Sequence, residues 1–279
     1  MKIKILSDST CDLSSALLEE NNISLVPLTV VKGDEQFKDG VTITAADIFA
    51  HVAAGGDLCS TAANSIGEYA DIFEQYTEFD GVIHITIGSG FSSCYQNATL
   101  AAEDYPNVRV VDSQNLSTGQ GLVVLKACEL AKTAADLDAL ADEIRAYTEK
   151  VEASFLVDKL DYLAKGGRCS AVAALGANLL NLKPCIEVKN GKMGVVKKYR
   201  GKYEKCLASY VKERLAGRED IDRKTLFVTK TEVSDVCYEA VMAAVAENGG
   251  FENTYETTAG CTVSCHCGPG TLGVLFVRK

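Results

Sequence analysis

The sequence lacks the features that direct a chain to membranes or nucleic acids. No apolar run approaches the roughly 18 residues that a membrane span needs. Basic residues are outnumbered, because 28 Lys and Arg against 38 Asp and Glu give a formal net charge of −10. This balance argues against nucleic acid or an anionic membrane surface as the main partner. The opening residues, 1–8, turn polar too early for a signal peptide, so we expect a cytoplasmic protein without an integral membrane segment.

The usual nucleotide and nucleophile motifs are also missing. There is no G-x-x-x-x-G-K-[ST] loop, and the loop after the first predicted strand has no glycine, so the dinucleotide fingerprint fails. No serine lies in a G-x-S-x-G elbow. Of only three histidines, His51 falls on a predicted helix and His84 in a buried strand, where structural roles are expected. His266 lies in a glycine turn, where it could donate to a carboxylate or act as a base.

The 11 cysteines do not form a recognisable disulfide or metal pattern. Their number is odd, they are spread over the chain, and no C-x-x-C pair is present. A strand is predicted over 254–265. If its alternation continues to residue 267, one face carries Cys261, Cys265 and Cys267, and the other carries His266. We therefore expect buried thiols that pack as small hydrophobes, and no metal site.

Strands alternate with helices along the first half of the chain, which predicts an α/β fold with a mainly parallel sheet. The predicted strands are 2–6, 82–87 and 108–111. The predicted helices are 13–20, 66–76 and 135–147, and two more that end near Glu103 and near residue 132. A break near 148–153 divides the chain into two α/β domains, 1–152 and 153–279. The second domain has strands 153–157, 225–229, 254–265 and 271–277, an Asn190-Gly191 hairpin within 185–199, and helices 159–164, 171–182, 202–216 and 234–247.

The loops after the first-half strands have a common composition of Ser, Thr, Asp, Gly and Asn, without Lys or Arg. Hydroxyls and free N–H groups at helix starts suit a singly charged anion such as a carboxylate better than a polyphosphate. The alternative is that these residues cap their own helices. Asp8 and Asp112 each end a strand, where an Asp more often caps a helix or orders its loop than performs acid–base chemistry.

The predicted helix 171–182, AVAALGANLLNL, is apolar on nearly all sides. It packs either in the core between the two domains or along a tunnel for an apolar ligand. An anion site beside an apolar slot would suit a fatty acid, although the residues alone do not require one.

Several segments together resemble the DegV family of bacterial fatty-acid-binding proteins. They occur in the family's order and cover essentially the whole chain: Ser7-Asp8-Ser9-Thr10-Cys11-Asp12-Leu13, TIGSGFSSCYQNA at 86–98, Asp112-Ser113, LDYLAKGGR at 160–168, Leu182-Lys183-Pro184 and His266-Cys267-Gly268-Pro269-Gly270. The resemblance implies two α/β domains with one long-chain fatty acid between them and no other cofactor. It also implies that the protein is not an enzyme but presents the acyl carboxylate to a separate ATP-dependent fatty acid kinase, which makes acyl-phosphate for phospholipid synthesis.

The resemblance also implies which residues hold the carboxylate. Carried over by position, they are Thr61 with Ser60 adjacent, Ser92 or Ser93, and His266, while Arg168 matches the family's Gly-Gly-Arg and closes the site. Ser60-Thr61-Ala62-Ala63 stands where the family has Thr-Ser-Gln-Pro, and Ser93 replaces a glycine, so the contacting hydroxyl in each pair stays open.

Two further hypotheses concern partners and chemistry. The basic residues Lys197, Lys198, Arg200 and Lys202 are a candidate docking surface for an acidic kinase, or else a solvated face. The alternative function is a small-anion transferase or hydrolase that uses His266 at the domain interface.

Overall fold

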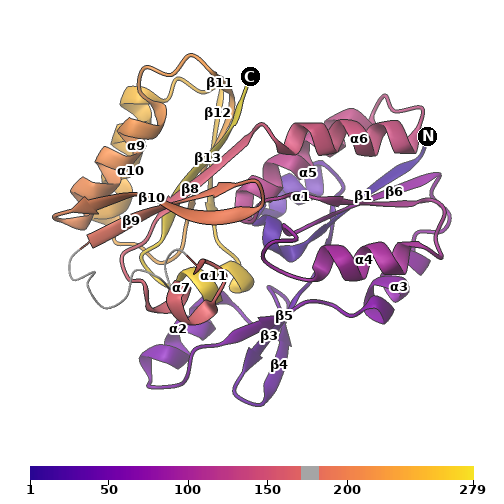
Figure 1. The fold of residues 1–279 in the computed structure, drawn as a ribbon, viewed down its shortest axis with the longest axis horizontal. Coiled ribbons are helices and arrows are strands. Elements are labelled where there is room, and N and C mark those ends of the chain that lie inside the picture. Colours follow the sequence, from indigo (N-terminus) through magenta and orange to yellow (C-terminus); the bar gives the residue numbers. More distant parts are fainter. Residues whose placement is uncertain (171–181) are drawn as a thin grey trace.

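The computed structural model describes residues 1–170 and 182–279, which form two main sheets and a third, smaller one (Figure 1). The first sheet is parallel, as predicted, with the strand order β2-β1-β6-β7. Every residue of β6 is buried, the pattern of a strand covered on both faces. The strands are β1 (Ile3–Asp8), β2 (Ser24–Val26), β6 (Gly81–Thr86) and β7 (Val108–Asp112).

Helices cover both faces of this sheet, with α3 and α4 on one side and α5 and α6 on the other (Figure 1). Their positions confirm the α/β pattern of the first half. The helices are α1 (Ser15–Glu20), α3 (Ile66–Glu74), α4 (Cys94–Ala102), α5 (Ser117–Ala131) and α6 (Leu137–Thr148), and a short 3-10 turn, η1 (Ser9–Cys11), follows β1.

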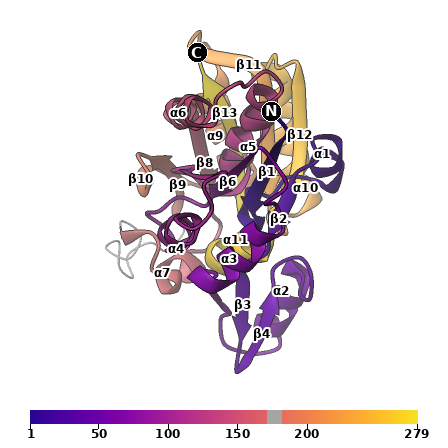
Figure 2. The same cartoon turned by 90° about the vertical axis from the view of Figure 1, so that its right-hand side faces the viewer.

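A three-stranded antiparallel sheet and one helix extend from the end of the molecule away from the termini (Figures 1 and 2). The sequence predicts only a polar loop over 59–65, where the structure has a strand. Strands this short and this exposed carry no hydrophobic alternation that would reveal them. His51 does lie on a helix, as predicted. The elements are β3 (Thr29–Lys32), β4 (Glu35–Lys38), β5 (Ser60–Ala62) and α2 (Ala45–Ala53).

The second main sheet has the order β10-β9-β8-β13-β11-β12, with α9 and α10 on its outer face (Figure 1). Asn190 and Gly191 join β9 to β10 with φ values of 51° and 68°, the two positive values of a tight hairpin turn, so the predicted hairpin is confirmed. The sequence division at residue 152 stays a prediction. The elements are β8 (Val151–Leu156), β9 (Leu182–Lys189), β10 (Lys192–Arg200), α9 (Tyr203–Leu215), β11 (Ile221–Lys230), α10 (Asp235–Asn248), β12 (Asn253–Thr258) and β13 (Leu272–Arg278).

The predicted strand over 254–265 is wrong in its second half. Strand β12 ends at Thr258, and helix α11 (Cys261–Cys267) follows after Gly260. The cysteines, threonine and valine of this segment favour a strand locally, but tertiary contacts override that preference. Two carboxylates from the first half of the chain accept the backbone N–H groups at the start of α11, which stabilises a helix there. Strands β12 and β13 are not neighbours in the sheet, because β11 lies between them.

Helix α7 (Asp161–Gly166) ends at Gly167, whose φ of 68° is the left-handed conformation that a glycine helix stop prefers. The apolar helix predicted over 171–182 lies, apart from Leu182, outside the described residues, and Leu182 itself begins β9.

Helix α5 lies between the two main sheets and contacts strands of both. Its residues from Ser117 to Val124 are all buried, as expected for a helix that is covered on all sides. Loops from both halves therefore meet beside the N-terminus of α5. Within the described part of the chain, no helix combines the length and the apolar character needed to cross a membrane.

Candidate ligand site

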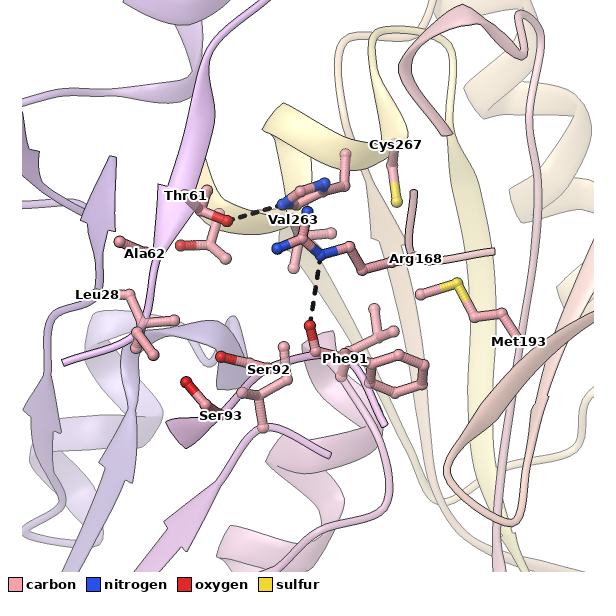
Figure 3. Close-up of a pocket in the computed structure, with 15 residues that line it drawn as sticks. Leu28, Thr61, Ala62, Phe91, Ser92, Ser93, Arg168, Met193, Val263 and Cys267 are labelled. Atoms are coloured by element: carbon pink, nitrogen blue, oxygen red, sulfur yellow. Dashed lines mark hydrogen bonds between the residues drawn. The ribbon is translucent and has the colours of Figure 1, made fainter. Parts of the chain in front are cut away.

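A cavity of about 120 Å³ lies where the two halves of the chain meet (Figure 3). Most of its wall is apolar, and polar side chains are grouped on part of it. Among the described residues the lining is Leu28, Thr61, Ala62, Ala63, Ile87, Phe91, Ser92, Ser93, Leu116, Arg168, Met193, Thr262, Val263, His266 and Cys267. Five of the six predicted site residues are therefore brought together: Thr61, Ser92, Ser93, Arg168 and His266.

His266, on α11, bridges to Thr61, on β5, with 2.8 Å between Nε2 and Oγ1 (Figure 3). Its other ring nitrogen, Nδ1, is buried and has no hydrogen-bond partner among the described residues. A Cβ on Gly166 would lie 2.7 Å from this Nδ1, so only glycine fits beside the ring. An unpartnered buried N–H costs more than an unpartnered lone pair, and we therefore assign the ring proton to Nε2.

The imidazole of His266 is neutral at physiological pH. Burial, with a smaller effect of the nearby Arg168 guanidinium, lowers the pKa of His266 to about 4. With its proton on Nε2, the ring donates to Thr61 Oγ1. The Thr61 hydroxyl is then free to donate its own proton into the cavity.

Ser60 does not line the cavity. It pairs with Val31 in the small sheet, whereas Thr61 pairs with Val30, and successive strand residues point to opposite faces. Ser60 is exposed, and Thr61 is half-buried on the cavity side. Of the two adjacent hydroxyls, the structure brings Thr61 to the site.

Ser92 and Ser93 both line the cavity at the start of α4, but their hydroxyls are used differently. Ser92 Oγ lies 3.1 Å from Cys94 Sγ and accepts the Cys94 N–H at 3.4 Å. Ser93 occupies the N-cap position, yet its side chain makes no capping hydrogen bond. The hydroxyl of Ser93 is exposed and available to a ligand, so the predicted capping role does not apply to it.

Arg168 follows α7 and reaches across to the first half of the chain. Its Nη1 donates to Gly166 O at 2.8 Å, and its Nε donates to Phe91 O at 3.5 Å (Figure 3). The side chain is exposed, so the guanidinium lies where the polar part of the cavity faces the exterior. It supplies a positive charge beside the neutral His266.

Asp8 and Asp112 order the loops of the site and do not line its wall. Buried Asp8 accepts the Ile87 N–H at 2.9 Å and the Tyr69 hydroxyl at 3.0 Å. Asp112 accepts both the backbone N–H and the hydroxyl of Ser89, at 3.1 and 2.5 Å. Asp112 also accepts the Gln114 N–H at 2.8 Å and so orders its own loop as predicted, whereas Asp8 holds the start of the loop after β6 and not its own.

The sequence gives no indication of the two carboxylates that hold α11. Asp39 accepts the N–H groups of Cys261 and Thr262, at 2.9 and 3.2 Å, and the Thr262 hydroxyl at 2.7 Å. Asp12 accepts the Gly260 N–H at 2.9 Å and the Ser117 hydroxyl at 2.6 Å. Both carboxylates come from the first half of the chain, so they fix the His266 helix relative to the Thr61 strand. Only Asp12 lies in a motif quoted above, and no local pattern distinguishes Asp39.

The cysteines are buried, as predicted, but those at 261–267 do not lie on one face of a strand. All eleven cysteines are buried. Because α11 is a helix, Cys261 and Cys265 point together into a cluster with Phe49 and Tyr162, while Cys267 lines the cavity. In the described ranges, no three His, Cys, Asp or Glu side chains are grouped as metal ligands would be.

The predicted basic surface lies on β10, an edge strand of the second sheet. Lys197 faces α9, where it pairs with Glu213 at 2.6 Å. A register shift between Val195 and Lys197 changes the alternation, so Lys198 and Arg200 lie on the same sheet face as Met193, a cavity residue. Lys202 is exposed at the N-cap of α9.

These observations define a two-domain α/β protein with a mostly apolar ligand cavity between the domains and polar groups gathered at one part of it. A family model described as "Uncharacterised protein, DegV family" matches residues 2–279. The chain belongs to the DegV family.

Known members are similar over their whole length. A DegV domain-containing protein of Clostridium acetobutylicum is 31% identical over 284 residues, covering 100% of this chain and 99% of the relative. A DegV family protein of Thermus thermophilus, whose structure is described as one of fatty acid binding, has a TM-score of 0.88 at 28% identity, with 100% of both chains covered. A stearic acid-binding protein of Eubacterium ventriosum has a TM-score of 0.82 at 27% identity, covering 99% of this chain and 98% of that one. The descriptions of these two solved relatives thus state fatty-acid binding, and the predicted family and fold class are confirmed.

Proposed function

We propose that this protein binds one long-chain fatty acid between domains 1–152 and 153–279 and presents its carboxylate to a separate, ATP-dependent fatty acid kinase. The observation that carries the proposal is the grouping of Thr61, Ser93, Arg168 and His266 on one part of a mostly apolar cavity. Fatty acids have this same division, with one charged end and a long apolar remainder. Solved relatives described as fatty-acid binders support the choice of ligand.

The polar groups suit a carboxylate in number and kind. The Thr61 hydroxyl, freed as a donor by the His266 Nε2–H, and the uncapped Ser93 hydroxyl can each donate to one carboxylate oxygen. Arg168 adds a positive charge, and its side chain donates to two backbone carbonyls but to no carboxylate among the described residues. A hydrogen bond to a charged group contributes about 1.5–3 kcal/mol, so these residues can fix which end of the ligand is held here.

The geometry at His266 supports binding over catalysis. In a transferase or hydrolase, a general-base histidine accepts the nucleophile's proton and is oriented by a third group at its other nitrogen. Here Nε2 carries the proton toward Thr61, and Nδ1 faces Gly166 without a partner among the described residues. We therefore favour a carrier without turnover of its own over the enzyme alternative.

Presentation to a kinase requires that the carboxylate end be reachable. Ser93 and Arg168 are both exposed, which puts the polar part of the cavity near the surface. Lys198 and Arg200 lie on the sheet face that also carries Met193 of the cavity wall, so an acidic partner bound to them would sit close to the site.

Native mass spectrometry of the purified protein, followed by denaturation of the same sample, tests the proposal. A bound mass of about one fatty acid that is released on denaturation is the expected result. A mass without ligand that stays unchanged after incubation with mixed fatty acids would overturn it. Thr61→Val should retain less ligand than wild type, and Ser60→Ala is the matched control, because its side chain points away from the cavity.

A further inference from the structure

A second, smaller cavity lies beside the ligand site and shares part of its lining. Its volume is about 30 Å³, and it is enclosed by the end of α11, the start of α5 and the inner face of the second sheet. Its exposed wall is almost entirely apolar in spite of several threonines near it.

Three side chains belong to the walls of both cavities: Leu116, Val263 and Cys267. Val263 and Cys267 are four residues apart on α11 and therefore share one helix face. Leu116 meets them from the loop that starts α5. We refer to these three residues as the partition.

One member of the partition, Cys267, lies on the side of the first cavity that is away from its hydroxyl groups. In Figure 3, Cys267 and Met193 are on the side away from Thr61 and Ser93, where the carboxylate is proposed to bind. The Cys267 side chain is buried, and burial raises its thiol pKa to about 12. It therefore presents a neutral, apolar sulfur to a chain passing it.

We infer that the partition of Leu116, Val263 and Cys267 determines how many methylenes of a fatty acid the protein accepts, because it separates the ligand cavity from a second apolar space. This inference rests on the proposed fatty-acid function and deepens it by naming residues that select the acyl chain. Cys267 lies away from Thr61 and Ser93, so changing it should alter which chain is preferred without removing the hydroxyl groups proposed to hold the carboxylate.

The size of the residue at position 267 should therefore shift the preferred chain length in either direction. Cys267→Ala removes the sulfur and joins the two spaces, which favours longer chains. Cys267→Leu adds bulk to the partition and favours shorter ones. Each methylene that gains or loses a buried position should change affinity about fourfold, the equivalent of about 0.8 kcal/mol.

Competition measured by native mass spectrometry tests this inference. Wild type and both variants are stripped of ligand and incubated with an equimolar mixture of myristic, palmitic, stearic and arachidic acids. Cys265→Ala is the matched control, because it removes the same sulfur from the same helix on the face that packs against Phe49 and Tyr162. Thermal melting of every variant identifies any that fails to fold.

The expected result is a stearic-to-myristic ratio raised about fourfold or more in Cys267→Ala and lowered in Cys267→Leu, with Cys265→Ala unchanged. If folded Cys267 variants keep the wild-type ratio, the partition does not select chain length, and the proposed binding function stands. If wild type retains none of the four acids, the proposed function itself fails.

Discussion

Gly90 and Gly191 meet backbone to backbone, one from the loop that carries Ser92 and Ser93, the other from the β9–β10 hairpin. A Cβ placed on Gly90 would lie 2.1 Å from the carbonyl oxygen of Gly191, so no side chain fits between them. The hairpin tip thereby contacts the hydroxyl-bearing loop of the first domain. Two residues after Gly191, the same hairpin supplies Met193 to the cavity wall.

Gly90→Ala should separate the hairpin from this loop. The added methyl group meets backbone, which cannot rotate away as a flexible side chain can. We expect faster hydrogen exchange in residues 88–93 and faster loss of bound fatty acid, with the fold otherwise intact. Gly194→Ala in β10 is the control, because no atom of residues 1–170 or 182–279 lies within 4 Å of its added Cβ. Equal exchange rates in both variants would mean that the contact does not hold the loop.

His266→Ala removes the group that orients Thr61, and it tests carrier against enzyme. For a carrier, retention of fatty acid should weaken by about 1.5–3 kcal/mol, between about tenfold and about a hundredfold in affinity. The measurement is titration of the ligand-free protein with a fatty acid. A variant that binds as tightly as wild type but loses turnover of some acyl substrate would favour the enzyme alternative.

Asp39→Ala should destabilise the protein and weaken ligand binding together. The buried carboxylate accepts hydrogen bonds from Cys261, Thr262 and Ser9, and losing a charge-assisted bond of this kind costs at least about 1.5–3 kcal/mol. Urea unfolding measures the loss of stability. Asp34→Ala, in the exposed turn between β3 and β4, is the control and should leave the midpoint unchanged. If Asp39→Ala unfolds at the same urea concentration as wild type, α11 is held in place by its apolar packing alone.

Asp12 should make the protein less stable as pH rises from about 4 to about 7. Burial, opposed by its hydrogen bonds and assisted by neighbouring Asp39, raises the pKa of Asp12 from 3.8 to about 7. Between these pH values Asp12 keeps its proton in the folded state but has lost it in the unfolded state. The contribution of Asp12 to stability is therefore present at low pH and is lost as pH rises through 7.

The comparison with Asp12→Asn isolates this effect from other titrating groups. The amide can still accept the Gly260 N–H but does not ionise, so the difference in unfolding free energy between the two proteins should change across this pH window. Urea midpoints at about pH 4.5 and about pH 7.5 are sufficient. Parallel pH profiles for both proteins would rule out a titrating Asp12.

Much of the fold could be predicted from the sequence because buried elements carry strong patterns. The all-buried run of β6 and the Asn190-Gly191 turn are local signals, and both were interpreted correctly. Helix α11 could not be recognised, because the carboxylates that stabilise its start, Asp12 and Asp39, are more than two hundred residues away in sequence. Contacts between residues so far apart leave no periodicity in a single chain.

Some residues of the candidate site could likewise be predicted from the sequence, and others could not. His266 stands out locally by its glycine turn, and the family resemblance supplied Thr61 or Ser60 as a pair. Choosing between the two needed the register of β5 on β3, which places only Thr61 on the cavity side. The partition residue Leu116 could not be identified, because an apolar residue before a helix looks the same whether it packs in a core or lines a cavity.

The proposed kinase surface leads to a prediction about charge. Lys198→Glu with Arg200→Glu should leave the bound fatty acid in place and lower acyl-phosphate formation when the kinase and ATP are added. Lys197 is left intact, because its pairing with Glu213 holds β10 to α9. Lys150→Glu with Lys279→Glu makes the same change in net charge at two other exposed lysines and serves as control.

Salt dependence provides a second test of this surface. Because an electrostatic encounter is screened by salt, the wild-type rate should fall with ionic strength, and the Lys198→Glu, Arg200→Glu double variant should lose that dependence. Equal rates in the two double variants at low salt would show that the partner docks elsewhere.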